Sequence, residues 1–484
     1  MNLLQSSLVL TFARLTNYAV MIITPLVLVR MLDVTTYGQY REFLLYATVL
    51  VAFLALAIKD NLMYLIPRRP TEAETATSQT IGMLLVTSTL GMLIFAFGRD
   101  WFLARASFDF ALPLMLYVFF FINFDVLENY WLAKQQARHV LIFSTLRILA
   151  RVIVVVGATY AFHDLKSILY CTVALEIIKA GVCLYILWRL RLLVFRIDRS
   201  LLMEQLRFIV PLSGAGLLFF VNEKAGQLYI STVMGATALA IYTVGTYQLP
   251  VVAIIRSAVS DTLFPEMVRH AANDSMEGLD LWRMANVYYC FLAFPIFMVL
   301  FVFADLFIVT LFTESYREAT GVFQIALLVM IRQCFEMGTP LRAANANRHV
   351  LWGNAIAVLV HLPLLFILSK AIGILGAAVA WLVADLTISA YLASRIMARY
   401  HIGVSGLALW PQVFKLAGAA VLAAPPLLLA AGLTSGSLLA ALGASLVFGG
   451  LYVLLVKRIG VTEIDALLVS LLGLFRRALP GGPR

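Results

Sequence analysis

Long apolar runs alternate with short polar segments along the whole chain of 484 residues. A transmembrane helix needs about 20 mostly apolar residues to cross the hydrocarbon core of a bilayer. On this criterion the sequence predicts about fourteen spans, at residues 8–32, 42–65, 79–98, 111–134, 138–162, 167–190, 206–231, 237–262, 285–312, 319–339, 349–369, 374–398, 411–432 and 436–457. The pattern therefore predicts an all-α integral membrane protein with little mass outside the bilayer.

Composition supports the same conclusion. Apolar residues make up 62% of the chain and charged residues 13%, against about 25% charged residues in soluble domains. The mean hydropathy is +0.94. The first apolar stretch lacks a preceding basic segment and a small-residue cleavage site, so we expect a retained first helix and not a signal peptide.

The net charge of +10 does not indicate nucleic-acid binding, because the basic residues lie singly or in small groups between apolar runs. Lys and Arg gather in the segments after even-numbered spans and in the C-terminal tail. By the positive-inside rule these segments and both termini are cytoplasmic. The basic connector from Arg189 to Arg207 and the tail have helical spacing of apolar and basic residues, which predicts amphipathic helices on the inner leaflet.

Two sequence matches indicate an internal duplication. RMLDVTTYGQY in the first half resembles VMGATALAIY in the second, which places Tyr40 over Tyr242, and ARHVL at 137–141 resembles NRHVL at 347–351. Six spans per half give both halves the same orientation, so we expect a pseudo-twofold axis along the membrane normal. The predicted parts are a six-helix lobe at 1–190, a basic connector at 191–205, a second six-helix lobe at 206–400, an appended helix pair at 401–457 and a tail at 458–484.

The chain resembles the polysaccharide and oligosaccharide flippases of the multidrug/oligosaccharidyl-lipid/polysaccharide exporter superfamily. The likeness is carried by PLVLVRMLDVTTYGQY at 25–40, by IKDNLMYLIPR at 58–68 and by GILGAAVAWL at 373–382. Asn61 stands where the family usually has Gly, and the neighbouring Lys59 is atypical, so the chain is a divergent member.

The resemblance implies a flippase that moves a polyprenyl-diphosphate-linked oligosaccharide from the inner to the outer leaflet by alternating access. Its cargo would be a unit of O-antigen, capsule or exopolysaccharide, its location the bacterial inner membrane, and its partners membrane lipids, a polysaccharide polymerase and glycosyltransferases. A drug/cation antiporter of the same superfamily is the alternative. A membrane-embedded polysaccharide polymerase is less favoured, because the longest outer segment, 99–110, offers no catalytic acid pair.

Charged side chains within the spans are the candidate functional residues, because each costs at least ~2.5 kcal/mol at the bilayer centre. Basic residues predominate in the first six spans and acidic residues in spans 7 to 12. Arg332 and Glu336 are spaced i,i+4, which predicts a simple ion pair. Asp60 is at the same depth as Arg14 across the first hairpin, so these two residues can form an ion pair. Lys59 then has no predicted carboxylate partner.

Hairpin geometry singles out one unpaired cation. Because spans 4 and 5 are joined by a tight turn, Arg147 is level with Asp125 and close to Glu128. Arg151 lies one turn deeper, opposite Phe121, where span 4 offers no acid. Across the next hairpin Arg151 is level with Lys179, with Glu176 one turn away.

We therefore hypothesise that Arg151 and Lys179 bind the diphosphate, because the guanidinium fork matches pairs of phosphate oxygens. The candidate substrate-binding residues are Arg151, Lys179, Arg147, Lys59 and Arg14, and the candidate supporting or ion-coupling residues are Glu176, Asp60, His361, Asp385 and Glu223. His361 and Asp385 are expected at similar depth, where they either form a static hydrogen bond between two helices, the favoured alternative, or act as a titratable pair that senses a proton gradient.

No further chemistry is indicated. Cys171, Cys183, Cys290 and Cys334 all lie in apolar runs without metal-ligand spacing, and we expect them to be core residues. No nucleotide-binding loop is present, so ATP is not expected to drive the protein directly, and neither a metal nor a cofactor is predicted.

Overall fold

The computed structural model of the chain describes residues 23–194, 197–247, 266–270, 276–433, 437–461 and 464. The regular structure in these ranges is helical. The first part contains α2 (Val34–Ala55), α3 (Asn61–Arg68), α4 (Ala73–Phe97), α5 (Arg99–Phe102), α6 (Ala111–Asn123), α7 (Val126–Ala133), α8 (Ala137–Phe162), α9 (Leu165–Arg189), α10 (Arg199–Met234) and α11 (Ala236–Gly245). The second part contains α13 (Glu277–Val302), α14 (Ala304–Phe312), α15 (Ala319–Arg332), α16 (Gly338–Ala343), α17 (Asn347–Tyr400), α18 (Trp410–Ala423), α19 (Pro425–Leu433) and α20 (Leu438–Ile459).

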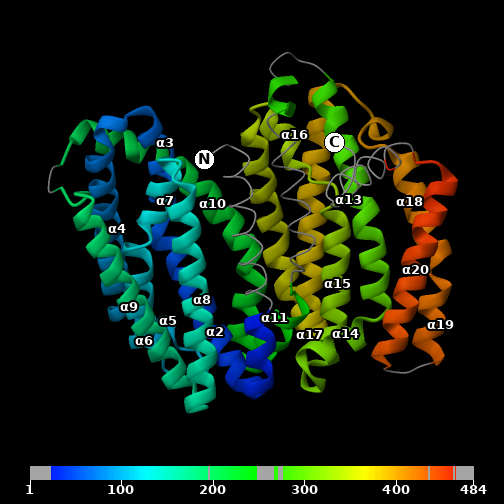
Figure 1. The fold of residues 1–484 in the computed structure, drawn as a ribbon, viewed down its shortest axis with the longest axis horizontal. Coiled ribbons are helices and arrows are strands. Elements are labelled where there is room, and N and C mark those ends of the chain that lie inside the picture. Colours follow the sequence, from blue (N-terminus) through cyan, green and yellow to red (C-terminus); the bar gives the residue numbers. More distant parts are fainter. Residues whose placement is uncertain are drawn as a thin grey trace, which may run out of the picture. The chain divides into compact units, whose positions relative to one another are not determined.

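The helices confirm the predicted all-α membrane fold. Among the described residues, nine helical segments are long and apolar enough to cross a membrane, and two shorter apolar helices accompany them. Figure 1 shows the long helices of each part running side by side. Most of the first predicted span, the second half of the eighth and nearly all of the C-terminal tail lie outside the described residues.

Several spans are interrupted, and the interruptions recur in the two halves of the sequence. The break between α4 and α5 at Gly98 has a counterpart at Phe303, between α13 and α14. The break at Asp125, between α6 and α7, has a counterpart between α15 and α16. The turn at His163 corresponds to the non-helical Ile372 within α17. Each counterpart follows its partner by 205 to 210 residues, close to the spacing of the sequence matches, which supports the predicted duplication.

The chain divides into two units by packing, at residues 1–243 and 244–484. This boundary differs from the predicted repeat boundary, because α10 and the first part of α11 belong to the first unit. In the second unit the appended helices pack on α13, where Tyr452 of α20 donates a hydrogen bond to the carbonyl of Phe291 (3.0 Å). Cys183, Cys290 and Cys334 are buried, as expected for core residues, whereas Cys171 is only partly buried, and none of the four forms a disulfide.

The predicted amphipathic helix between Arg189 and Arg207 is wrong. Helix α9 ends at Arg189, the described residues from 190 to 198 are not helical, and α10 begins at Arg199. Asp198 explains the new start, because its carboxylate accepts hydrogen bonds from the backbone N–H groups of Ser200 (2.8 Å) and Leu201 (3.1 Å). Such an N-cap satisfies helix-end donors and fixes where a helix begins.

The start of α2 packs tightly on the start of α11. Asp33 caps α2, and the side-chain hydrogen bond from Thr36 is the main reason that the pKa of Asp33 falls below its ordinary value. The hydroxyl groups of Thr35 and Thr237 are 3.1 Å apart. A Cβ atom on Gly38 would lie 2.1 Å from the carbonyl oxygen of Ala236. Only glycine allows these two backbones to approach so closely.

We expect Gly38→Ala to destabilise the protein, because the added methyl group must push α2 away from α11. Overpacking of this kind costs about 1–3 kcal/mol. The measurement is thermal unfolding of the purified protein in detergent. Gly82→Ala in α4 is the matched control, because no atom lies within 4 Å of the Cβ position there. Equal melting temperatures for the two variants would contradict the close approach.

Candidate functional site: a cationic cavity in the first unit

The break between α6 and α7 places a buried carboxylate among cations. Asp125 lies in this break, directly before α7, and is 7% exposed. Its oxygens pair with Lys59 (2.8 Å) and with Arg147, and Arg147 also pairs with Glu128 (2.9 Å). The predicted pairing of Arg147 with both acids is confirmed. Two cations and two carboxylates therefore compensate one another in this cluster.

Lys59 is not the leftover cation that the sequence suggested. The interruption between α2 and α3 brings it to Asp125, 66 residues away in sequence. Its neighbour Asp60 accepts a hydrogen bond from the side-chain amide of Asn129 (3.2 Å). The proposed partner of Asp60, Arg14, lies outside the described residues.

Lys179 and Glu176 form a second buried pair, on successive turns of α9. Their charged atoms are 2.5 Å apart, and the ammonium group lies 4.8 Å from the ring centre of Phe121. An ammonium group carries three donors, and this ion pair engages one of them. Lys179 therefore keeps donors for a ligand.

Arg151 has no carboxylate within ion-pairing distance in the described part of the chain. Its guanidinium carbon lies 5.5 Å from the ring centre of Tyr117, and its Nη2 atom is buried without a hydrogen-bond partner. The Nε atom of Arg41, in α2, is also buried without a hydrogen-bond partner. Each of these groups is a cation that the surrounding protein leaves with unused hydrogen-bond donors.

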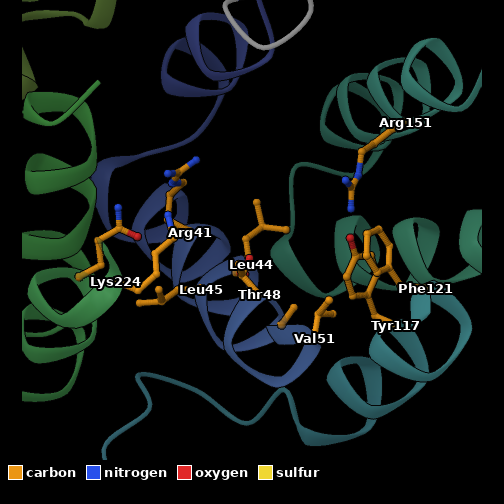
Figure 2. Close-up of a pocket in the computed structure, with 11 residues that line it drawn as sticks. Arg41, Leu44, Leu45, Thr48, Val51, Tyr117, Phe121, Arg151 and Lys224 are labelled. Atoms are coloured by element: carbon orange, nitrogen blue, oxygen red, sulfur yellow. The ribbon is translucent and has the colours of Figure 1, made fainter. Parts of the chain in front are cut away.

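Arg41, Arg151 and Lys224 line one cavity of about 400 Å³, and no carboxylate is among the described residues of its lining. Figure 2 shows Arg41 and Arg151 approaching it from different helices, with Tyr117 and Phe121 close to Arg151. We call it the polar cavity, because Thr48 and Gln227 also contribute to its wall. The ammonium group of Lys224 is 2.9 Å from the carboxylate of Glu223, which does not line the cavity.

A second cavity of about 400 Å³ lies between α8 and α9. It shares Arg151 and Phe121 with the polar cavity, so the two are neighbours. Its charged residues are Arg147, Arg151, Lys179, Asp125 and Glu176, and the rest of its lining is apolar. The structure thus brings Arg147, Arg151, Lys179 and Glu176 to one site, as predicted from hairpin geometry. It adds Arg41 and Lys224.

Sequence reasoning gave Arg41 no functional role, because Arg30 and Arg41 flank a predicted outer turn at which long basic side chains can reach water. The structure starts α2 at Val34, so Arg41 lies two turns inside the helix and not before it. The signal that could have found it is Asp33, a strong N-cap residue just ahead of the helix. Lys224 lies within the predicted span 206–231, where sequence reasoning gave it no role.

In the second unit, the predicted pair of Arg332 with Glu336 is wrong. Arg332 forms a two-point ion pair with Asp385 of α17, and Glu336 pairs with Arg342 (2.7 Å). The reason is the break between α15 and α16, since i,i+4 contacts need a continuous helix. His361 is buried at 1% exposure. Asp385 is thus already engaged by a cation, and its coupling with His361 stays a prediction.

The comparisons with known proteins agree with this architecture. The family model described as "Polysaccharide biosynthesis protein" matches residues 27–321. The chain belongs to this family. No curated protein matches its sequence.

Solved structures of the superfamily share the fold at low sequence identity. The lipid II flippase MurJ in an inward closed conformation aligns with a TM-score of 0.72 at 10% identity, covering 94% of this chain and 99% of MurJ. An inward-facing multidrug resistance MATE transporter aligns with a TM-score of 0.57 at 14% identity, covering 81% and 96%. A superfamily transporter from Pyrococcus furiosus, described as having a binding pocket of reverse polarity, aligns with a TM-score of 0.51 at 15% identity, covering 81% and 96%. The predicted family resemblance and multi-pass membrane fold are confirmed.

Paired and unpaired arginines should differ in their effect on stability. Arg147→Met leaves Glu128 without its cation and Asp125 with only Lys59, so we expect a loss of roughly 2 kcal/mol, less than for a fully buried pair. Arg151→Met removes a cation that holds no carboxylate and should leave stability nearly unchanged. Unfolding of both variants in detergent measures the difference. A larger loss for Arg151→Met would contradict the assignment of Arg151 as the uncompensated cation.

Proposed function

We propose that the protein is a flippase that moves a polyprenyl-diphosphate-linked oligosaccharide from the inner to the outer leaflet by alternating access. The observation that carries the proposal is Arg151, a cation that has no carboxylate partner in the described ranges and that lies beside a cavity within the membrane-spanning helices. A charge at this depth costs several kcal/mol unless water or an opposite charge compensates it. An anionic ligand provides that compensation.

The chemistry of the site favours a diphosphate as the anion. Arg151 and Lys179 together present a guanidinium fork and an ammonium group to the same cavity. A guanidinium binds two phosphate oxygens at once, and an ammonium adds a point charge. Glu176 holds Lys179 in place without occupying all of its donors.

The polar cavity suits the sugar part of the cargo. Thr48 and Gln227 provide hydroxyl and amide groups, and the stacked rings of Tyr117 and Phe121, 5.7 Å apart, provide a flat apolar wall. Arg41 and Lys224 add donors for hydroxyl or carboxylate groups. The cargo would be a unit of O-antigen, capsule or exopolysaccharide.

The drug/cation antiporter is the alternative, since MATE transporters share the fold. The lining of the polar cavity argues against it, because Arg41, Arg151 and Lys224 would repel a cationic drug. In the second unit, Asp385 is occupied by Arg332. A membrane-embedded polymerase is less favoured still, because the described lining of the polar cavity contains no carboxylate, and Asp125 and Glu176 of the neighbouring cavity are paired with cations.

The proposal includes the cellular setting. The protein would lie in the inner membrane of a bacterium, with both termini in the cytoplasm. It would receive its cargo from glycosyltransferases on the inner side and deliver it to a polysaccharide polymerase on the outer side.

We expect Arg151→Ala to abolish flipping of lipid-linked glycan in proteoliposomes while the protein still inserts and folds. Arg151→Lys should recover only part of the rate, because a point charge cannot replace the fork. Arg317→Ala is the matched control, because Arg317 forms its ion pairs at an exposed turn of the second unit and lines neither cavity. Flipping by Arg151→Ala at the wild-type rate would refute the cationic site.

A test of the proposed coupling role of Asp385 needs a variant that does not leave Arg332 without a carboxylate partner. Asp385→Asn alone leaves Arg332 without its carboxylate, so a loss of transport could be structural. We therefore expect Arg332→Gln combined with Asp385→Asn to fold and to lose the response of transport to an imposed proton gradient. Transport by the double variant that still follows the gradient would exclude Asp385 as the coupling group.

A further inference from the structure

The cavity between α8 and α9 has one polar side and one apolar side. Arg147, Arg151 and Lys179 lie on the polar side. On the other side Leu146, Ile178 and Val182 line the cavity and are 62%, 65% and 51% exposed. Apolar residues with such exposure on a membrane-spanning helix face hydrocarbon and not water. The cavity therefore borders the bilayer.

The apolar side continues as a strip along both helices. Ile153 of α8 is 68% exposed, and Tyr185 of α9 is 55% exposed. These residues follow the cavity-lining Leu146 and Val182 by about one or two helical turns. We call the strip with Leu146, Ile178 and Val182 the α8–α9 groove.

Polarity changes in one direction across the two cavities. The polar cavity with Arg41, Thr48 and Gln227 comes first, Arg151 and Phe121 form the shared wall, and the α8–α9 groove follows. An amphiphilic lipid has its parts in the same order: a hydrophilic head, an anionic linking group and a hydrocarbon tail. Contact between each part and a surface of like polarity avoids the cost of burying polar groups in hydrocarbon or apolar groups in water.

We infer that the α8–α9 groove binds the hydrocarbon chain of a phosphorylated polyprenyl lipid, with its diphosphate at Arg151 and Lys179 and its sugars in the polar cavity. The inference rests on the proposed function and adds the orientation of the cargo. The tail stays in contact with the bilayer throughout, so only the head group has to enter the polar cavity. An ordinary anionic phospholipid presents similar chemistry, and the experiment separates the two sources.

The binding test uses a photo-reactive benzophenone amino acid at position 178, which lines the groove. The control carries the same label at Leu184, which is 46% exposed on α9 but does not line the cavity. The probes are undecaprenyl diphosphate and phosphatidylglycerol, each added to the full-length protein in nanodiscs.

We expect undecaprenyl diphosphate to be captured at position 178 and not at 184, in preference to phosphatidylglycerol, and capture to fall with Arg151→Ala. Equal capture of both lipids at 178 would make the groove a general anionic-lipid site and overturn the inference. Equal capture at 178 and 184 would indicate ordinary lipid contact and overturn it too.

The transport test fills the groove with Val182→Trp and uses Leu184→Trp as the control. Displacing two methylene groups of the bound chain corresponds to about tenfold weaker binding, so flipping at subsaturating cargo should slow by a similar factor in Val182→Trp alone. Thermal unfolding of both variants checks that they fold. Wild-type flipping by Val182→Trp would refute the groove and leave the proposed function intact. Absence of glycan flipping in the wild-type protein would instead refute the proposed function.

Discussion

Charge compensation inside the membrane is the constraint on which the rest of this structure depends. The hydrocarbon core offers no water to solvate an ionised side chain, so each one needs a partner, a cavity or a ligand. Asp125 has Lys59 and Arg147, Asp385 has Arg332, and Glu176 has Lys179. Arg151 has a cavity and no carboxylate among the described residues. Arg41, whose buried Nε atom also lacks a partner, lines the same cavity, so these two arginines mark the site among charges that are otherwise largely compensated.

Interrupted helices create these arrangements. The gap between α2 and α3 would leave backbone groups without partners, and α10 supplies some of them: the Ser213 hydroxyl accepts a hydrogen bond from the N–H of Ala57 (3.2 Å). Beside the same gap, the side chain of Gln205 donates to that of Asn61 (3.0 Å). Non-helical backbone survives at membrane depth only where protein or water satisfies it in this way. The gap brings Lys59 within reach of Asp125, which a continuous helix would not guarantee.

The contacts of Asn61 suggest a physical reason why this chain has Asn where the family pattern usually has Gly. A glycine at this point would serve the turn through its backbone freedom alone. Asn61 instead donates to the hydroxyl of Thr80 (3.1 Å) while it accepts from Gln205, so it ties α3 to α4 and α10. Buried networks of this type hold a unique arrangement when their members are satisfied. The tie holds the start of α3 against α4 and α10, two residues after Lys59.

The sequence by itself determined the membrane class, most span positions and the family, because apolar length and the order of short motifs are local properties. It also predicted that Arg147 meets Asp125 and Glu128 and that Arg151 lies beside Lys179, since a tight hairpin fixes the depth of residues on both arms. Only the tertiary structure decided the partners of Lys59, Arg332 and Glu336, because helix breaks alter the spacing that sequence arithmetic assumes. Only it placed Arg41 and Lys224 beside Arg151, since these residues come from helices distant in sequence and their shared cavity depends on how α2, α8 and α10 pack.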